Sequence, residues 1–574
     1  MLARIAQTAS SLISRPSVFL PALLLLCLGV SAGYVDSRLP TPDEGALLTA
    51  ATKIRRGADF YQDLDAYLFP GAHYALAIGM EIFGEHLSVA RWMAAAFYCG
   101  IVASLYAAAL QLMDRSWAAL FGLYLLSCKF LTWPAFSAYL YSDVAFFGAC
   151  VALAALVGHG FRGASPRLLL AGAGIGLAFA CKQNVGIYLG AASAAALLFP
   201  GLVTGIRGGP LRQRFGEVAA LLLGVAAALT PLLGYFAWKG LLGKMLYSGL
   251  IRPLTRYLPT SGIPFSPPLA WWRLGEIQGD AASPYFVDLY WHMLQQQQLP
   301  GPDAYPFYWL TGELFSRLVY TSIPVAFLWM LARRIRSGRR GDEWAAKTSH
   351  FAFLALAVVA SAFPRADSFH VLSVYPVVAL LIFALLAWGT DQRRASRRLW
   401  AVGCAVALLL AICVVLTANY RAHLSYRVRL PRAEIWVDPA EAWIEPLVTY
   451  VSQHVQPGDH IFVYGHEAQL YFLTGRFYPW PYSQLYPGQE GGDGGVTLVK
   501  LLRRVRPKLV LLGVLTWPGV PDLKEYAPKL DEYIRWNFDP DENFFIDHPV
   551  PGGKIPPDWV ISVMHPIPPE AWFK

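Results

Sequence analysis

Long apolar runs separated by short polar loops make up most of this 574-residue chain. Crossing the hydrocarbon core of a bilayer takes a helix of roughly 20 apolar residues, and eleven of the runs approach or exceed that length. They predict membrane-spanning helices over residues 18–35, 90–112, 116–135, 144–158, 168–182, 183–203, 215–238, 307–332, 348–363, 371–389 and 399–418. The expected fold is therefore a polytopic α-helical membrane protein.

One further apolar segment, 73–83, is too short to span. It has only about a dozen residues and includes His73 and Glu81. We expect it to be a helix lying on the outer membrane surface. With that assignment the arginine-rich loops all fall on one side, as the positive-inside rule requires; they contain Arg115, Arg162, Arg167, Arg207, Arg212, Arg214, Arg333, Arg334, Arg336, Arg339, Arg340, Arg393, Arg394, Arg397 and Arg398. The N-terminus is predicted to be cytoplasmic and the C-terminus to lie outside.

The composition agrees with a membrane protein. Hydrophobic residues make up 56% of the chain and charged residues only 15%, whereas a soluble domain has roughly 25% charged residues. The net charge of +9 is explained by the cytoplasmic loops, so no nucleic-acid partner is expected. All seven cysteines lie in or beside apolar segments, which argues against disulfides and cysteine-based metal sites.

Four regions are expected outside the membrane: 36–89, a short turn at 139–143, the loop 239–306, and the tail after about 419. The tail predicts a small α/β domain, with strands over 460–464, 508–514 and 559–564 and helices over 467–473 and 497–505. We therefore predict two domains, a transmembrane domain over 1–419 and an extracytoplasmic α/β domain over 420–574. The Gly465-His466-Glu467 turn in the tail is most simply a polar turn between a strand and a helix.

The first outer loop carries the candidate chemistry. Pro42-Asp43-Glu44-Gly45 follows the first apolar run directly, so its carboxylates should lie at the water boundary. There they can stay ionised and still reach a headgroup in the membrane surface. An enzyme acting on a lipid-linked substrate would place its base at this depth.

The order of motifs in the membrane half, roughly 40 to 420, resembles the GT-C glycosyltransferases, and most closely the protein mannosyltransferase and lipid A aminoarabinose transferase-like group. The resemblance is carried by Asp43-Glu44-Gly45, Gly57-Ala-Asp-Phe-Tyr61-Gln-Asp63, Pro70-Gly71, Phe83-Gly84 and Arg91. It implies transfer of a sugar from a polyprenyl-phosphate donor to a lipid, glycan or protein acceptor. The expected place is the outer face of the bacterial inner (plasma) membrane.

The resemblance also implies roles for three acidic residues. Asp43 matches the catalytic acidic residue of the family's first loop, and Glu44 stands beside it. Asp143, in Tyr141-Ser142-Asp143, matches a second acidic position, although the proline that often follows is Val144 here. Two plainer readings stay open: Asp43 could cap a helix beginning at Gly45, and Asp143 could be a polar residue at the end of a span.

The sequence offers two main candidates for the cations that would hold the donor phosphate. Related enzymes often carry a lysine at the position of Phe69, so the phosphate-binding role must move to other residues or the donor must be held differently. Lys182 is a candidate because a lysine in so apolar a stretch is costly unless it has a function or its ammonium snorkels to the membrane surface. Arg365 is the second, since arginine binds phosphate in a bidentate manner, with His370 close by in Arg365-Ala-Asp367-Ser-Phe-His370. An Arg365–Asp367 pair tying the turn is the alternative.

Some polar residues of the outer regions have less specific roles. Asp63, Asp65 and His73 are expected to bind the acceptor or the sugar. They could hold a divalent cation, but such a cluster is more often a hydrogen-bonded surface, so no required metal or other cofactor is predicted. Arg252 and Arg256 remain possible phosphate ligands or headgroup contacts.

Two other classes of function are compatible with a polytopic membrane protein. A transporter or flippase for a glycolipid would place ionisable groups near the middle of the membrane and often shows internal repeats. Here the ionisable residues gather at one face and we find no repeat. A non-catalytic sugar-binding membrane protein is the other alternative, and the tail alone could support it.

Overall fold

The computed structural model describes residues 15–131, 137–159, 163–205, 208–263, 265, 306–336, 343–366, 368–388, 392–513, 521–547 and 561–567. Most of the predicted outer loop 239–306 lies outside these ranges, as do Asp367 and the first two residues of the strand predicted over 559–564.

Each predicted span corresponds to a helix in the structure. The helices are α2 (Pro16–Val35), α5 (Leu87–Leu112), α6 (Arg115–Leu131), α7 (Tyr141–Val157), α8 (Pro166–Cys181), α9 (Gln183–Leu198), α11 (Leu211–Trp238), α15 (Pro306–Arg336), α16 (Glu343–Ala360), α17 (Ser368–Ala387) and α18 (Gln392–His423). The short α10 (Pro200–Val203) follows α9. The prediction of a polytopic helical membrane protein is confirmed.

Helix length and composition place nine of the eleven helices in two groups, and α6 and α16 fall in neither. Among the described residues, five helices are long and apolar enough to cross a membrane on their own: Pro16–Val35, Leu87–Leu112, Leu211–Trp238, His370–Ala387 and Ser396–His423. Four shorter apolar helices lie at Tyr141–Val157, Pro166–Cys181, Gln183–Leu198 and Arg317–Ala332. How many of the eleven helices cross the bilayer, and in which direction, stays a prediction.

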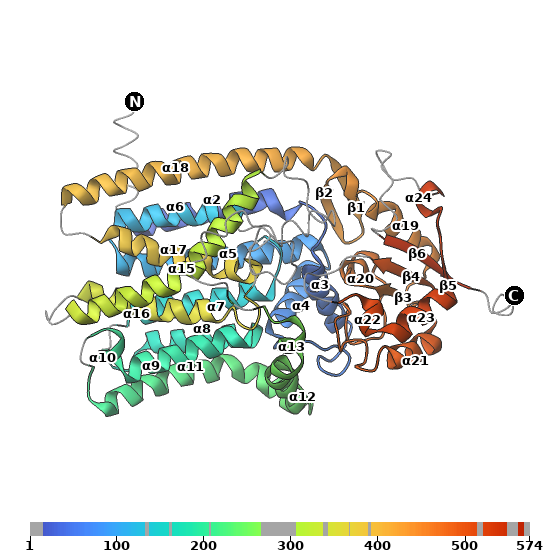
Figure 1. Ribbon diagram of the computed structural model, residues 1–574, viewed down its shortest axis with the longest axis horizontal. Coiled ribbons are helices and arrows are strands. Elements are labelled where there is room, and N and C mark those ends of the chain that lie inside the picture. Colours follow the sequence, from blue (N-terminus) through green and yellow to red (C-terminus); the bar gives the residue numbers. More distant parts are fainter. Residues whose placement is uncertain are drawn as a thin grey trace.

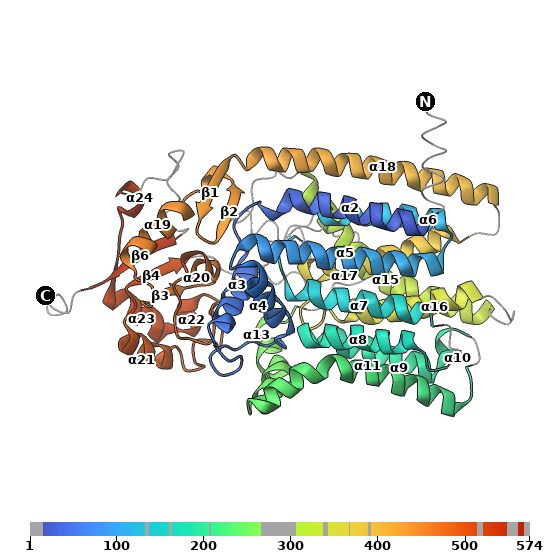
Figure 2. The same ribbon diagram turned by 180° about the vertical axis from the view of Figure 1, so that it is seen from behind.

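The long helices run side by side in one bundle, with α18 along one edge and α9 and α11 along the other (Figures 1 and 2). Inside the bundle α8 packs closely against both α7 and α11. Gly148 of α7 and Gly174 of α8 make this approach possible, since a Cβ on either would stand 2.5 Å from the carbonyl oxygen of the other. Small residues are the usual means of close helix packing in membranes.

Two short helices lie at the end of the bundle that faces the C-terminal region: α3 (Pro42–Arg55) and α4 (Gly71–Phe83) (Figure 2). The α4 helix is the 73–83 segment, and its 13 residues are separate from α5, as expected for a helix that does not span. Near the same end lie α12 (Leu242–Leu246), two π-helical turns (Tyr247–Ile251 and Pro253–Tyr257) and α13 (Leu258–Ser261).

The C-terminal region, residues 426–567, is an α/β unit that follows α18 after two residues. A four-stranded sheet has the order β3-β4-β6-β5, with β3 and β4 parallel and the other pairs antiparallel. The elements are β1 (Tyr426–Leu430), β2 (Ala433–Val437), a 3-10 turn (Pro439–Glu441), α19 (Ile444–His454), β3 (Ile461–Tyr464), α20 (Gln469–Thr474), α21 (Val496–Val505), β4 (Leu509–Gly513), α22 (Leu523–Tyr526), α23 (Pro528–Asn537), β5 (Phe538–Pro540), α24 (Phe544–Asp547) and β6 (Ile561–Pro566).

The C-terminal region is hydrogen-bonded to the residues that leave α2. The backbone nitrogen of Trp436 in β2 donates to the carbonyl of Asp36 at 2.7 Å, and that of Arg38 donates back to Trp436 at 2.8 Å. Two ion pairs flank this junction, Arg38–Glu441 at 2.7 Å and Arg421–Asp36 at 2.6 Å. The tail therefore sits in a defined position against the first outer loop.

Candidate active site

Asp43 lies in the first turn of α3, at the bundle end that faces the C-terminal region (Figure 1). The helix begins at Pro42, and its N-cap is Thr41, whose side-chain oxygen accepts a hydrogen bond from the Glu44 nitrogen at 3.2 Å. Asp43 is therefore not the cap of a helix beginning at Gly45. Its side chain is half-buried, which leaves it able to meet a substrate.

Glu44 is placed quite differently from its neighbour. Its carboxylate is fully buried and forms an ion pair with Arg91 of α5, with Nη2–Oε2 at 3.1 Å and Nε–Oε1 at 3.3 Å. It also accepts a hydrogen bond from the backbone nitrogen of Tyr139 at 3.1 Å. These bonds hold α3 against α5 and the 137–140 turn, so the geometry favours a structural role for Glu44.

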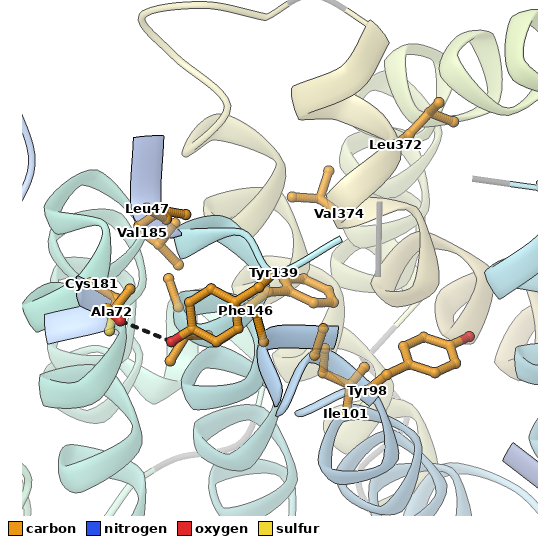
Figure 3. Packing of buried hydrophobic residues seen from close by; sticks show 14 of the residues in the cluster. Leu47, Ala72, Tyr98, Ile101, Tyr139, Phe146, Cys181, Val185, Leu372 and Val374 are labelled. Carbon is orange, nitrogen blue, oxygen red and sulfur yellow. Dashed lines mark hydrogen bonds between the residues drawn. The ribbon is translucent and has the colours of Figure 1, made fainter. Parts of the chain in front are cut away.

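Tyr139 also helps to hold α3 in place. Its ring is fully buried among Leu47 of α3, Cys181 of α8 and Phe146 of α7, and its hydroxyl donates to the carbonyl of Ala72 in α4 at 2.8 Å (Figure 3). The α3 helix therefore rests on a buried ring that α4, α7 and α8 also pack against. A catalytic side chain needs supporting contacts of this kind to keep its geometry.

Lys182 lies beside the first turn of α7, which also carries Asp143. The ammonium of Lys182 donates to the Ser142 hydroxyl at 3.1 Å and lies 5.6 Å above the ring of Tyr141. Asp143, the next residue, is buried with only 1% of its surface exposed. The structure thus brings Lys182, at the junction of α8 and α9, to Ser142, the residue that precedes Asp143.

Arg365 lies in the turn between α16 and α17. This turn pairs with Ile263, which donates to the carbonyl of Pro364 at 3.1 Å and accepts from the Ala366 nitrogen at 2.9 Å. The side chain of Arg365 is half-buried, and so is that of His370 in the first turn of α17.

Tyr486 of the C-terminal region joins these groups into one site. Asp43 and Arg365 both lie within electrostatic reach of its hydroxyl, together with Tyr141 and Tyr257. Burial and the negative charge of Asp43 hold the pKa of Tyr486 well above its usual range, while Arg365 acts in the opposite direction. A carboxylate from the first outer loop and a guanidinium from the turn before α17 are therefore both near enough to the same tyrosine for their charges to act on it.

A second polar cluster lies beside the first and is centred on Arg252. This guanidinium pairs with Asp65 and lies 4.4 Å above the ring of Tyr67. Asp65 also accepts a hydrogen bond from the hydroxyl of Tyr482 in the C-terminal region at 2.7 Å. The Asp65 and Tyr482 side chains tie the first outer loop and the tail to Arg252, which lies between the two π-helical turns.

The remaining candidates do not form a common site with Asp65. Asp63 is exposed and accepts from the Asp59 nitrogen at 2.8 Å, closing a turn. His73 is buried against the ring of Phe60 at a centroid distance of 4.8 Å, and burial lowers its pKa to about 4. In the part of the chain that the structure describes, no group of three or more His, Cys, Asp or Glu side chains is arranged to hold a metal ion.

Three residues at the centre of the arrangement carried no decisive signal in the sequence. Tyr486 and Tyr482 lie in the tail, far from Asp43 along the chain, and tyrosine is too common there to mark a site. Arg91 is part of the resemblance and opens a predicted span, which indicates a buried arginine in need of an acidic partner but does not identify Glu44 as that partner.

A family model for dolichyl-phosphate-mannose-protein mannosyltransferases matches residues 69–207. A comparison with curated protein sequences gives no match. Among solved structures, ArnT from Cupriavidus metallidurans bound to undecaprenyl phosphate aligns with a TM-score of 0.54 at 14% identity, covering 96% of this chain and 98% of ArnT. Its apo state gives 0.52 at 15% identity, covering 95% and 97%.

The apo oligosaccharyltransferase of Archaeoglobus fulgidus also aligns, with a TM-score of 0.50 at 11% identity, covering 86% of this chain and 69% of that one. At these identities the likeness establishes the fold. The matched proteins are GT-C superfamily membrane glycosyltransferases, and this chain has the GT-C fold that the resemblance in its sequence predicted.

Proposed function

We propose that the protein is a membrane glycosyltransferase that moves a sugar from a polyprenyl-phosphate donor to a lipid, glycan or protein acceptor. The observation that supports this proposal is the GT-C fold with a half-buried carboxylate, Asp43, at the end of its helix bundle; Asp43 and the half-buried Arg365 are both near enough to Tyr486 for their charges to act on its hydroxyl. The GT-C fold supports the same class of reaction, and one neighbour with that fold holds undecaprenyl phosphate.

The reaction needs little beyond these groups. The acceptor hydroxyl oxygen attacks the anomeric carbon, and the bond from that carbon to the phosphate oxygen breaks, with the electron pair leaving on the lipid phosphate. The proton of the hydroxyl passes to Asp43 as general base. Arg365, with Lys182 near Tyr141, would stabilise the charge that grows on the departing phosphate.

The position of the site agrees with chemistry on a lipid headgroup. Asp43 is on a short helix at the end of the bundle and not in its middle (Figures 1 and 2). Transporters instead bind their substrates near the bilayer midplane on broken helices. We propose that this end faces the periplasm of a bacterial inner membrane, with the N-terminus in the cytoplasm, as the arginine distribution predicts.

The test uses the purified full-length protein in detergent. It is mixed with polyprenyl-phosphate sugars carrying a radiolabel and with a cell-envelope extract from a strain that lacks this protein, which should accumulate unmodified acceptor. Label should move to a product that mass spectrometry identifies. The matched experiment places the protein in vesicles without acceptor and measures movement of the labelled lipid across the bilayer.

The two experiments separate the proposal from its main alternative. Transfer in detergent that requires the extract supports a glycosyltransferase. Transbilayer movement without any transfer product would establish a flippase and remove the proposal. Binding of labelled lipid with neither transfer nor movement would leave a non-catalytic sugar-binding protein.

A further inference from the structure

The face of the C-terminal region that meets α3 has features of a binding surface that the donor chemistry does not use. The α20 helix lies directly against α3, where the Thr49 hydroxyl donates to the carbonyl of Ala468 at 3.0 Å. The contact is so close that a Cβ on Gly45 would stand 2.5 Å from the Cα of Gln469. Gly45 follows Asp43 by two residues, so the start of α20 lies against the same end of α3 that carries the proposed base.

Two buried polar atoms on this face have no hydrogen-bond partner among the described residues. They are Nδ1 of His466 and Oε1 of Gln469, and the two side chains are only 5% and 6% exposed. Burying a polar atom without a partner costs about 1–3 kcal/mol. Such atoms are therefore expected where a bound molecule supplies the missing bond.

Aromatic rings line the same face. The ring centroids of His466 and Tyr486 lie 4.8 Å apart. Tyr486 is half-buried, and the charges of Asp43 and Arg365 both act on its hydroxyl. Burial lowers the pKa of His466 to about 4, so its imidazole is neutral at pH 7. The face thus offers neutral hydrogen-bonding groups and aromatic surface beside a carboxylate, a combination that suits a neutral hydroxyl-bearing group better than an anion.

We propose that the C-terminal region forms one wall of the acceptor site, where Tyr486, backed by His466 and Gln469, orients a neutral hydroxyl-bearing acceptor toward Asp43. This inference rests on the proposed transfer function and adds the element that selects the acceptor. Tyr486 is a positioning residue in this scheme, because Asp43 takes the proton and Arg365 holds the phosphate. The donor site is then built by the membrane helices and the acceptor site by the tail.

The test is a pair of titrations on Tyr486 variants of the full-length protein. Transfer is measured at increasing amounts of the envelope extract from the strain that lacks the protein, which gives an apparent KM for the acceptor. Binding of undecaprenyl phosphate is measured separately. Tyr486→Phe removes one hydrogen bond and should raise the apparent KM about threefold to tenfold. Tyr486→Ala also removes the ring and should lower kcat/KM by about 10²-fold.

Undecaprenyl phosphate binding should be unchanged in both variants. Tyr533→Phe is the matched control, because Tyr533 is a half-buried tyrosine of α23 that packs on Phe538 in the same region. It should behave as the wild type.

Each other outcome has a definite meaning. If a folded Tyr486→Ala protein keeps the wild-type apparent KM and kcat, the tail does not form the acceptor wall. If undecaprenyl phosphate binding falls as much as transfer, Tyr486 belongs to the donor site and the inference is overturned. If the wild type itself transfers nothing, the failure lies with the proposed function and not with the assignment of Tyr486.

Discussion

Arg91 of α5 holds the buried carboxylate of Glu44 by two hydrogen bonds, of 3.1 and 3.3 Å, while Asp43 next to it stays half-buried. Arg91 also donates to the carbonyls of Val35 at 3.2 Å and Ser37 at 2.7 Å. One arginine therefore fixes the end of α2 and the start of α3 together. Two adjacent carboxylates that look equivalent in the sequence have different environments.

The first prediction is that Glu44 stabilises the fold. Glu44→Gln leaves the charge of Arg91 buried without its partner, and breaking a buried ion pair in this way costs about 3–5 kcal/mol. Thermal unfolding of the detergent-solubilised protein should show a clearly lower Tm. Glu81→Gln is the control, because Glu81 pairs with Arg55 at 2.7 Å but is 68% exposed, and its Tm should hardly change. A Glu44→Gln protein with normal Tm and no transfer would instead make Glu44 catalytic.

The second prediction concerns Asp43. Asp43→Asn keeps the size of the side chain but cannot accept a proton, so transfer should fall by about 10²-fold or more, the usual contribution of a general base. Undecaprenyl phosphate binding and Tm should stay near those of the wild type, since the cap of α3 is Thr41. Near-normal transfer in a correctly inserted protein would leave Asp143 as the candidate base.

The third prediction concerns the donor phosphate. Arg365→Ala removes a charge-assisted hydrogen bond to phosphate, worth about 1.5–3 kcal/mol, so undecaprenyl phosphate should bind about 10- to 100-fold more weakly. Arg365→Lys should recover only part of the affinity, because an ammonium lacks the guanidinium fork. Arg429→Ala, on β1 with a 69% exposed side chain, should bind normally. Unchanged binding in both Arg365 variants would return this residue to a structural role in its turn.

The eleven helices could be predicted from the sequence because each depends mainly on a local apolar run. The short α4 helix also follows from the sequence, because its length, its His73 and Glu81 and the distribution of arginines in the loops all argue against a span. The same holds for strands β3 (Ile461–Tyr464) and β4 (Leu509–Gly513), whose residues are almost all apolar. These features need no information from distant parts of the chain.

The contents of the site depend on contacts between distant segments, and the sequence indicates only some of them. Asp43, Lys182 and Arg365 could be named as candidates because each is an ionisable residue at a predicted boundary. Tyr486 comes close enough to feel the charge of Asp43. It does so because α20 packs on α3 and the tail pairs with residues 36–38. No local pattern reports such a contact.

The fourth prediction is a loss of stability in acid caused by His73. Its pKa is about 4 in the folded protein against about 6.5 when unfolded, so between these values only the unfolded chain binds the proton. The stabilisation is complete above about pH 6.5 and is lost as the pH falls toward 4; at pH 5 about 2 kcal/mol is gone.

Replacing His73 by phenylalanine keeps a ring against Phe60 and removes the titration. The variant His73→Phe should therefore lose less Tm between pH 7.5 and pH 5 than the wild type does. His454→Gln on α19 is the control, because the His454 side chain is exposed, and it should follow the wild-type curve. Identical slopes for His73→Phe and the wild type would show that His73 is protonated in the folded protein.

The last prediction tests the close contact between α3 and the C-terminal region. In Gly45→Ala the new methyl group would lie 2.5 Å from the Cα and 2.7 Å from the Cβ of Gln469, so α20 must move away. Overpacking of this kind costs about 1–3 kcal/mol, which outweighs the roughly 1 kcal/mol that alanine gains over glycine in a helix. Gly33→Ala in α2 is the control, since nothing lies within 4 Å of its added methyl group, and it should be neutral or stabilising.

The displaced α20 carries Gln469 away from α3 and disturbs the neighbouring His466–Tyr486 pair. Gly45→Ala should therefore show a lower Tm, faster proteolysis between α18 and β3, and a raised apparent KM for the envelope extract, while undecaprenyl phosphate still binds to the helix bundle. A Gly45→Ala protein with wild-type Tm and wild-type transfer would mean that α3 and α20 can separate without consequence. The tail would then be dispensable for the orientation of the acceptor.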